Sequence, residues 1–142
     1  MKIFLDTNVI LDVLAGRQPF FADSQRVMTF CERNSGTGMA SVLTFCTVAY
    51  VLRKSLGRDQ MVVMLRNLRK FVAVLPMADR TVDWAIASGC SDFEDAMQYD
   101  CAVSGSADVI VTRDRAGFSI SQIPVVTFPQ FGPGLHWLLL LI

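Results

Sequence analysis

Three aspartates stand at positions where the carboxylates of one site could meet. Asp6 closes the short apolar run 2–5, Asp114 follows the apolar run 109–111 by three residues, and Asp95 opens the helical segment before that run. Acids grouped without a histidine or cysteine favour a hard cation such as Mg²⁺ or Mn²⁺. Each acid alone also fits a simpler role, as a helix N-terminal charge or a turn residue. The argument for chemistry therefore depends on the elements that bring the three together.

Short apolar runs alternate with helical patterns along the chain, and this order predicts an α/β fold. The runs that we expect to be strands are 2–5, 39–40, 71–75, 108–112 and 125–128. The segments that we expect to be helical are 8–15, 22–33, 41–55, 58–70, 79–87 and 92–104, with Ser41, Asp79 and either Ser91 or Asp92 as N-caps. In a parallel sheet covered by helices, ligands bind at the carboxyl ends of the strands, where Asp6 and Asp114 would lie.

The length of 142 residues predicts a single domain, residues 1–142. Hydrophobic residues make up 52% and charged residues 18%, which excludes a disordered chain and a coiled coil. The four cysteines lack zinc-site spacing, so we expect Cys46 and Cys101 in the core and a reducing, cytoplasmic compartment. We expect no signal peptide and no membrane span, because the apolar tail 132–142, which contains the single histidine, is shorter than the roughly 20 residues a span needs. This tail is expected to dock on the domain.

The net charge is zero, but the charges are unevenly distributed. Segment 53–70 contains six basic residues and one acid, whereas segment 79–108 contains seven acids and one arginine. The basic segment is a candidate track for the phosphates of a nucleic acid. Its candidate RNA contacts are Arg58, Arg66, Arg69 and Lys70. An ordinary solvated helix face explains the same pattern equally well.

Three short motifs follow one another along the chain. They are Asp6-Thr7-Asn8, Glu94-Asp95-Ala96 and Thr112-Arg113-Asp114, the last followed by an aromatic residue at Phe118. Together they resemble the motifs of PIN-domain ribonucleases, the family of the VapC-like toxins. The resemblance implies a three-layer α/β/α sandwich around a central parallel sheet. It also implies an acidic pocket that binds one or two Mg²⁺ or Mn²⁺ ions, and hydrolysis of single-stranded RNA.

The resemblance implies roles for individual residues and for partners. Asp6, Asp95 and Asp114 would be the catalytic metal ligands. The supporting residues would be Thr7, Asn8, Thr44 and Thr112. A homodimer and an antitoxin protein bound over the active site are the implied partners, with no membrane. Arg113, next to Asp114, is a candidate RNA contact and equally a candidate for a structural salt bridge.

Two positions depart from the family pattern. Thr47 stands where PIN nucleases usually carry a glutamate, in the helix after the second strand, and Gly117 replaces an acid common before the aromatic residue. The stretch 41–54 resembles a PIN subgroup common in bacteria of the Bacteroides type, which also lacks the glutamate. We therefore expect Glu94 or Asp92 to supply a fourth carboxylate.

The leading hypothesis is a metal-dependent endoribonuclease that acts as the toxin of a type II toxin-antitoxin pair. The alternative is a catalytically degenerate PIN module that binds nucleic acid or protein. An aspartate-nucleophile phosphatase is disfavoured because it needs a second acid two residues after the first, where this chain has Asn8. A dinucleotide-binding fold is disfavoured because no glycine-rich G-x-G-x-x-G turn follows the first apolar run.

Overall fold

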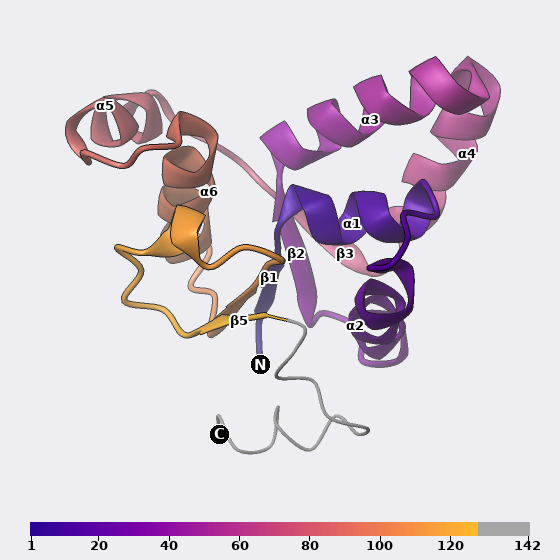
Figure 1. Ribbon diagram of the computed structural model, residues 1–142, viewed down its shortest axis with the longest axis horizontal. Helices are drawn as coiled ribbons and strands as arrows, with labels where there is room; N and C mark the ends of the chain where they lie inside the picture. The colour runs from indigo at the N-terminus through magenta and orange to yellow at the C-terminus, as the bar shows by residue number, and fades with distance from the viewer. Residues whose placement is uncertain (128–142) are drawn as a thin grey trace.

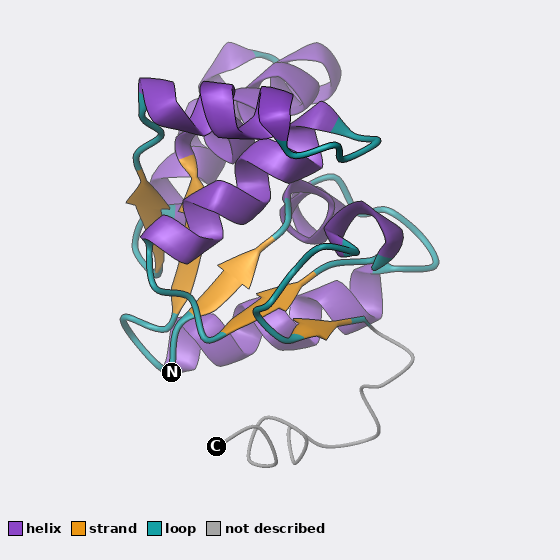
Figure 2. Cartoon of the chain, turned by 90° about the vertical axis from the view of Figure 1, so that its left-hand side faces the viewer, coloured by secondary structure: helices purple, strands orange, loops and turns teal. Residues whose placement is uncertain are grey.

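A computed structural model describes residues 1–127 of the chain. Its centre is one sheet of five parallel strands in the order β3-β2-β1-β4-β5, seen in Figure 2. The strands are β1 (Ile3–Leu5), β2 (Gly38–Ser41), β3 (Val72–Leu75), β4 (Val109–Val111) and β5 (Val125–Val126). They confirm the predicted α/β class. Phe128, at the end of the last predicted strand, and the predicted docked tail lie outside the described residues.

Helices cover both faces of the sheet, as the sequence predicts. They are α1 (Thr7–Leu14), α2 (Phe21–Arg33), α3 (Val42–Leu56), α4 (Arg58–Leu68), α5 (Asp79–Ala87) and α6 (Phe93–Ser104), with a short 3₁₀ helix, η1 (Ala116–Phe118), before β5. Figure 1 shows α1 to α4 on one side of the sheet and α5 with α6 on the other. Within residues 1–127, no helix combines the length and the apolar character needed to cross a membrane.

Alternating side chains of the short strands build two separate cores. Ile3 and Leu5 of β1 are fully buried in a cluster with residues of α1, α2 and α3. Phe4, which lies between them, is fully buried in a second cluster with Tyr99 of α6. Successive side chains of a strand point to opposite faces, so one strand can serve both helical layers. Each fully buried side chain of this kind contributes about 1.5–3 kcal/mol, which stabilises the three-layer arrangement.

The helix caps follow the sequence prediction with one exception, at Asp79. Ser41 caps α3, because its hydroxyl accepts a hydrogen bond of 3.0 Å from the Thr44 amide. Asp92, rather than Ser91, caps α6. The prediction of Asp79 as a cap is wrong by one residue: α5 already begins at Asp79, because the extended backbone of the preceding alanine takes the cap position.

The cysteine predictions hold only in part. Cys101 is buried as expected, but Cys46 is exposed on α3. The buried residues of this helix are Thr44, Val48 and Leu52. These repeat every four residues and define one face, so Cys46, two residues from its buried neighbours, lies on the opposite face. All four cysteines of the chain are in the described part, and all are free.

Replacing Ser41 by alanine should destabilise the protein by about 1–2 kcal/mol, because the substitution leaves a buried helix N-terminus without its cap. Urea denaturation would measure the change. Ser55→Ala is the matched control, because the Ser55 hydroxyl bonds to the Val51 carbonyl at the exposed end of the same helix. We expect the control to cost less than about 0.5 kcal/mol. Equal losses for the two variants would contradict the capping role.

Candidate active site

The pairing of β1 with β4 brings Asp6 next to the segment that carries Asp114. Leu5 pairs with Val111, and the Asp6 amide donates a hydrogen bond of 3.0 Å to the Val111 carbonyl. Both strands run in the same direction, so the residues that follow them leave the sheet at one edge. At this edge the Thr112 hydroxyl donates a hydrogen bond of 2.8 Å to Oδ2 of Asp6. Thr112, predicted as a supporting residue, therefore contacts the Asp6 carboxylate directly.

Asp114 lies in a tight turn after β4. Its amide donates to the Thr112 hydroxyl over 3.1 Å, and its own Oδ1 accepts a hydrogen bond of 2.8 Å from the Ala116 amide. Such a turn is typical of an aspartate whose side chain bonds to the backbone two residues on. Asp114 is exposed, so its carboxylate remains open to solvent beside the buried Asp6.

Asp95 approaches the same edge from the first turn of α6. The Asp95 amide donates a hydrogen bond of 3.0 Å to Oδ1 of Asp92, the cap residue. The backbone of Gly117 in η1 lies directly against the Asp95 carboxylate, and a Cβ atom at position 117 would overlap that carboxylate. The absence of an acid at position 117 therefore has a steric reason: a side chain there would displace either Asp95 or η1.

Burial, together with nearby negative charge, raises the pKa of two of these acids. The pKa of Asp95 is raised to about 7, first by burial and then by Asp6, Asp92, Glu94 and Asp114. The pKa of Asp6 is also raised, mainly by burial and slightly by Glu94, while the hydrogen bond from Thr112 opposes the shift. The predicted carboxylates are therefore close enough to repel one another.

The acids are gathered, but they do not form a ready-made chelate. Among residues 1–127, no group of three or more His, Cys, Asp or Glu side chains is arranged so that it could hold a metal ion. The chemistry of the donor set nevertheless fits Mg²⁺ or Mn²⁺, because every member is a carboxylate and the cluster carries surplus negative charge.

A buried polar network lies behind the acids, and it includes a residue that the sequence analysis missed. The Nε2 atom of Gln98 donates hydrogen bonds of 3.0 Å to the hydroxyls of Thr7 and Thr44. These two hydroxyls are 2.9 Å apart. Gln98 follows Asp95 by three residues on α6, and this spacing, which places both on one helix face, is the signal that could have revealed it. Asn8 is half-buried, and its Oδ1 lies 3.5 Å from Nη1 of Arg17.

Comparison with known proteins identifies the family. The sequence profile of the PIN domain matches residues 2–116. The chain belongs to the PIN domain family. Ribonuclease VapC1 of Aquifex aeolicus (strain VF5) is 25% identical over 135 residues, which covers 92% of each chain. This relationship is distant.

Solved structures of PIN proteins share the fold. VapC20 of Mycobacterium tuberculosis, described as a sarcin-ricin loop cleaving toxin, has a TM-score of 0.66 at 13% identity, covering 84% of this chain and 95% of its own. A toxin-antitoxin complex from Klebsiella pneumoniae has a TM-score of 0.65 at 19% identity, covering 89% of this chain and 97% of its own. At these identities the likeness extends to the fold and not to function.

Arg113 of this PIN domain is engaged in a salt bridge. Its Nη1 lies 3.2 Å from Oδ1 of Asp12, and its guanidinium stacks on the ring of Phe20 at 4.3 Å. Asp12 is fully buried, and the Ser24 hydroxyl donates a hydrogen bond of 2.9 Å to its Oδ2. Burial raises the pKa of Asp12, while Ser24 and Arg113 oppose the shift. The structure thus favours the structural alternative for Arg113 over RNA contact. The sequence signal for this salt bridge is Asp12, an acid inside the otherwise apolar helix α1.

Two of the candidate RNA contacts, Arg69 and Lys70, follow α4 and lie away from the acids. Both residues lie shortly before β3, which begins at Val72, so they stand at the amino edge of the parallel sheet, opposite the edge that carries Asp6. Nη1 of Arg69 donates a hydrogen bond of 3.0 Å to the Val72 carbonyl. Arg58 is exposed, and its Nη1 lies 3.8 Å from Oδ1 of the neighbouring Asp59. Their role in RNA binding stays a prediction.

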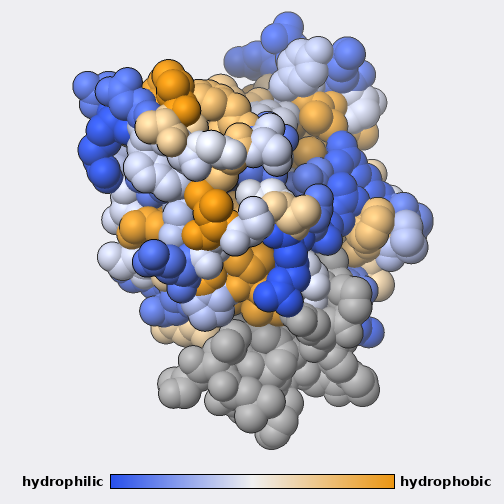
Figure 3. All heavy atoms as spheres, turned by 60° about the vertical axis from the view of Figure 1, so that its left-hand side comes forward, coloured by the Kyte–Doolittle hydropathy of each residue, from blue (hydrophilic) through white to orange (hydrophobic). Residues whose placement is uncertain are grey.

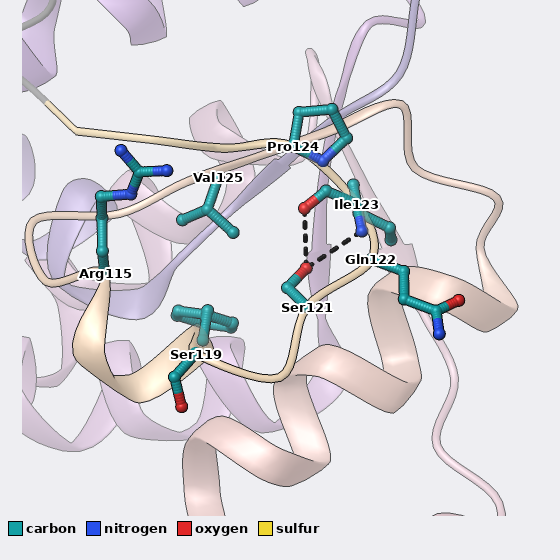
Figure 4. Close-up of a pocket in the computed structure, with 8 residues that line it drawn as sticks. Arg115, Ser119, Ser121, Gln122, Ile123, Pro124 and Val125 are labelled. Carbon is teal, nitrogen blue, oxygen red and sulfur yellow. Dashed lines mark hydrogen bonds between the residues drawn. The ribbon is translucent and has the colours of Figure 1, made fainter.

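Two further surface features of the PIN domain lie outside the group of acids. A hollow of about 470 Å³ between η1 and β5 is lined by Arg115, Gln122 and Val125 among others, and none of the candidate acids lines it (Figure 4). On the side of α5 and α6, apolar and hydrophilic side chains alternate over the surface (Figure 3). The most exposed large apolar residue there is Ile86, at 70%. Neither feature extends the acidic cluster.

Asp95→Asn should stabilise the metal-free protein at pH 8 and have little effect at pH 4. The pKa of Asp95 is raised from 3.8 to about 7 in the folded protein, so the free energy of unfolding falls as pH rises between these values. Above pH 7 the penalty is fully present, and the neutral amide removes it. After solvent screening at this half-buried site, the gain should be about 1–2 kcal/mol. Urea denaturation at both pH values, with the exposed Asp83→Asn as control, measures it. A gain of equal size at pH 4 would contradict the explanation by the raised pKa of Asp95.

Proposed function

We propose that this PIN domain is a metal-dependent endoribonuclease that hydrolyses single-stranded RNA. The observation that carries the proposal is the group of carboxylates around Asp95 at the carboxyl edge of the sheet. Such crowding destabilises the fold, and a divalent cation would relieve it. Membership of the PIN domain family and the distant likeness to a VapC ribonuclease support the same reading.

We assign Asp6, Asp95 and Asp114 as the residues that would hold Mg²⁺ or Mn²⁺. Glu94 is the better candidate for the fourth carboxylate, because it raises the pKa of both Asp6 and Asp95. One oxygen of Asp92 is already engaged as the cap of α6. Glu94 would then supply the negative charge that Thr47 does not.

The residues of the chain would act mainly by positioning. When bound, the divalent cation polarises the phosphate and lowers the pKa of a water molecule toward neutrality. Thr112 holds Oδ2 of Asp6 in one orientation, and the backbone of Gly117 packs directly against the Asp95 carboxylate. A fixed set of carboxylates is what oriented attack on a phosphodiester requires.

The proposed biological role is that of the toxin in a toxin-antitoxin pair. The solved relative from Klebsiella pneumoniae was crystallised as such a complex, and the relative from Mycobacterium tuberculosis is described as a toxin. We propose an antitoxin protein and a second copy of this chain as partners. The alternative function, a degenerate PIN module that binds nucleic acid or protein, is favoured by one observation, the threonine at position 47.

Asp95→Asn should reduce RNA cleavage by at least about 10³-fold and leave RNA binding intact or tighter, because it removes a metal ligand and one negative charge. A fluorescent single-stranded RNA with Mn²⁺, with Mg²⁺ and with chelator would measure both quantities. Asp83→Asn, on the exposed surface of α5, is the control and should cleave like wild type. Binding of RNA by wild type without cleavage under any metal condition would support the degenerate module instead.

The double charge reversal Arg66→Glu and Lys70→Glu should weaken RNA binding and flatten its dependence on salt. Each lost phosphate contact removes about 0.7 from the slope of log affinity against log salt for a single strand. Both side chains are exposed and make no ion pair within residues 1–127. Affinity measured from 50 to 300 mM salt tests the effect. An unchanged slope would show that this face is only a solvated surface.

A further inference from the structure

Gln98 is a buried polar residue that is neither a proposed metal ligand nor a proposed RNA contact. Its side chain is fully buried on α6, one helical turn after Asp95. Through Thr7 it contacts the residue that follows Asp6, and through Thr44 it contacts the first turn of α3. The network is extended by the Ser41 hydroxyl, which lies 3.2 Å from that of Thr44. One amide therefore links the helix of Asp95 to two other elements at the same edge of the sheet.

The stability of the fold alone does not account for this amide. The Oε1 atom of Gln98 is buried and has no hydrogen-bond partner within residues 1–127. An unsatisfied buried amide oxygen destabilises the folded state, and an apolar side chain of the same length would avoid this cost. The amide instead fixes the rotation of α6 about its axis, because both of its hydrogen bonds can form together only at one such rotation.

The neutrality of the amide also matters at this place. Four carboxylates already raise the pKa of Asp95, and a fifth behind them would add to the repulsion. Hydroxyl and amide groups can hold α6 against α1 and α3 without adding charge. Outer-shell hydrogen bonds that orient metal ligands act in the same way in other metal sites.

We propose that Gln98 is a positioning residue, which sets the orientation of Asp95 toward Asp6 by donating two hydrogen bonds to Thr7 and Thr44. The proposal rests on the proposed metal-dependent function. Gln98 itself lies behind the acids and contacts neither metal nor substrate. Loss of either hydrogen bond lets α6 rotate and moves Asp95 relative to Asp6.

The test measures Mn²⁺ affinity by calorimetry or by electron paramagnetic resonance, together with kcat and KM on a short RNA. Gln98→Met removes both hydrogen bonds at similar length, and Thr44→Val removes one hydroxyl without changing shape. Both should weaken Mn²⁺ binding by about 10-fold or more and lower kcat with little change in KM. Thr44→Ser, which keeps the hydroxyl, should restore Mn²⁺ affinity to within about threefold of wild type.

Thr81→Val is the matched control for lost stability. Thr81 donates a buried hydrogen bond of 2.7 Å to Asp100, which links α5 to α6 away from the acids. This variant should destabilise the fold and leave Mn²⁺ affinity unchanged. Native-like Gln98→Met and Thr44→Val proteins with wild-type Mn²⁺ affinity would overturn the proposal, as would an equal loss of affinity in Thr81→Val.

The two proposals can fail separately. If wild-type protein binds no Mn²⁺ and no Mg²⁺, the proposed function fails. Positioning is then tested without metal, by the backbone amide NMR shifts of Asp6 and Asp95. These shifts should move in Thr44→Val and return in Thr44→Ser. Unmoved shifts in Thr44→Val would overturn the positioning role.

Discussion

The parallel pairing of β1 with β4 is the constraint on which the candidate site depends. The hydrogen bond from the Asp6 amide to the Val111 carbonyl closes this pairing at its carboxyl end. Thr112, the first residue after β4, can then reach the Asp6 carboxylate. A slip of one residue would turn every side chain of the strand to the opposite face, so the two buried cores hold the register and, with it, the acids.

The candidate site is held by neutral groups around a charged centre. Thr112 bonds to Asp6, and Gln98 joins Thr7 to Thr44, all without adding a charge. The carboxylates themselves repel one another and gain no counter-charge from these supports. The raised pKa of Asp95 means that this arrangement lowers the stability of the fold at neutral pH.

A second buried charge secures the turn that carries Asp114. Asp12 of α1 pairs with Arg113, whose guanidinium also stacks on Phe20 at the start of α2. Removing one partner of a buried pair leaves an uncompensated charge, so both residues are needed together. The arginine that lies beside the acids in sequence therefore anchors the turn to the opposite helical layer.

Periodicity and short motifs determine much of this protein from its sequence. Alternation of apolar runs with helical patterns predicts the parallel sheet and its helices, because these signals depend only on residues near one another in the chain. Strand-end and helix-start positions likewise mark Asp6, Asp95 and Asp114 as a set. The cap of α3 at Ser41 is another local signal, and it is correct.

Contacts between distant residues were decided only by the tertiary structure. Gln98 lies 91 positions from Thr7, and no local pattern encodes the helix rotation that joins them. The same holds for the steric contact of Gly117 with Asp95 and for the pairing of Arg113. Cys46 is exposed because the rotation of α3 turns another face to the sheet. Strand order and helix rotation result from packing the whole chain at once, and they decide which side chains meet.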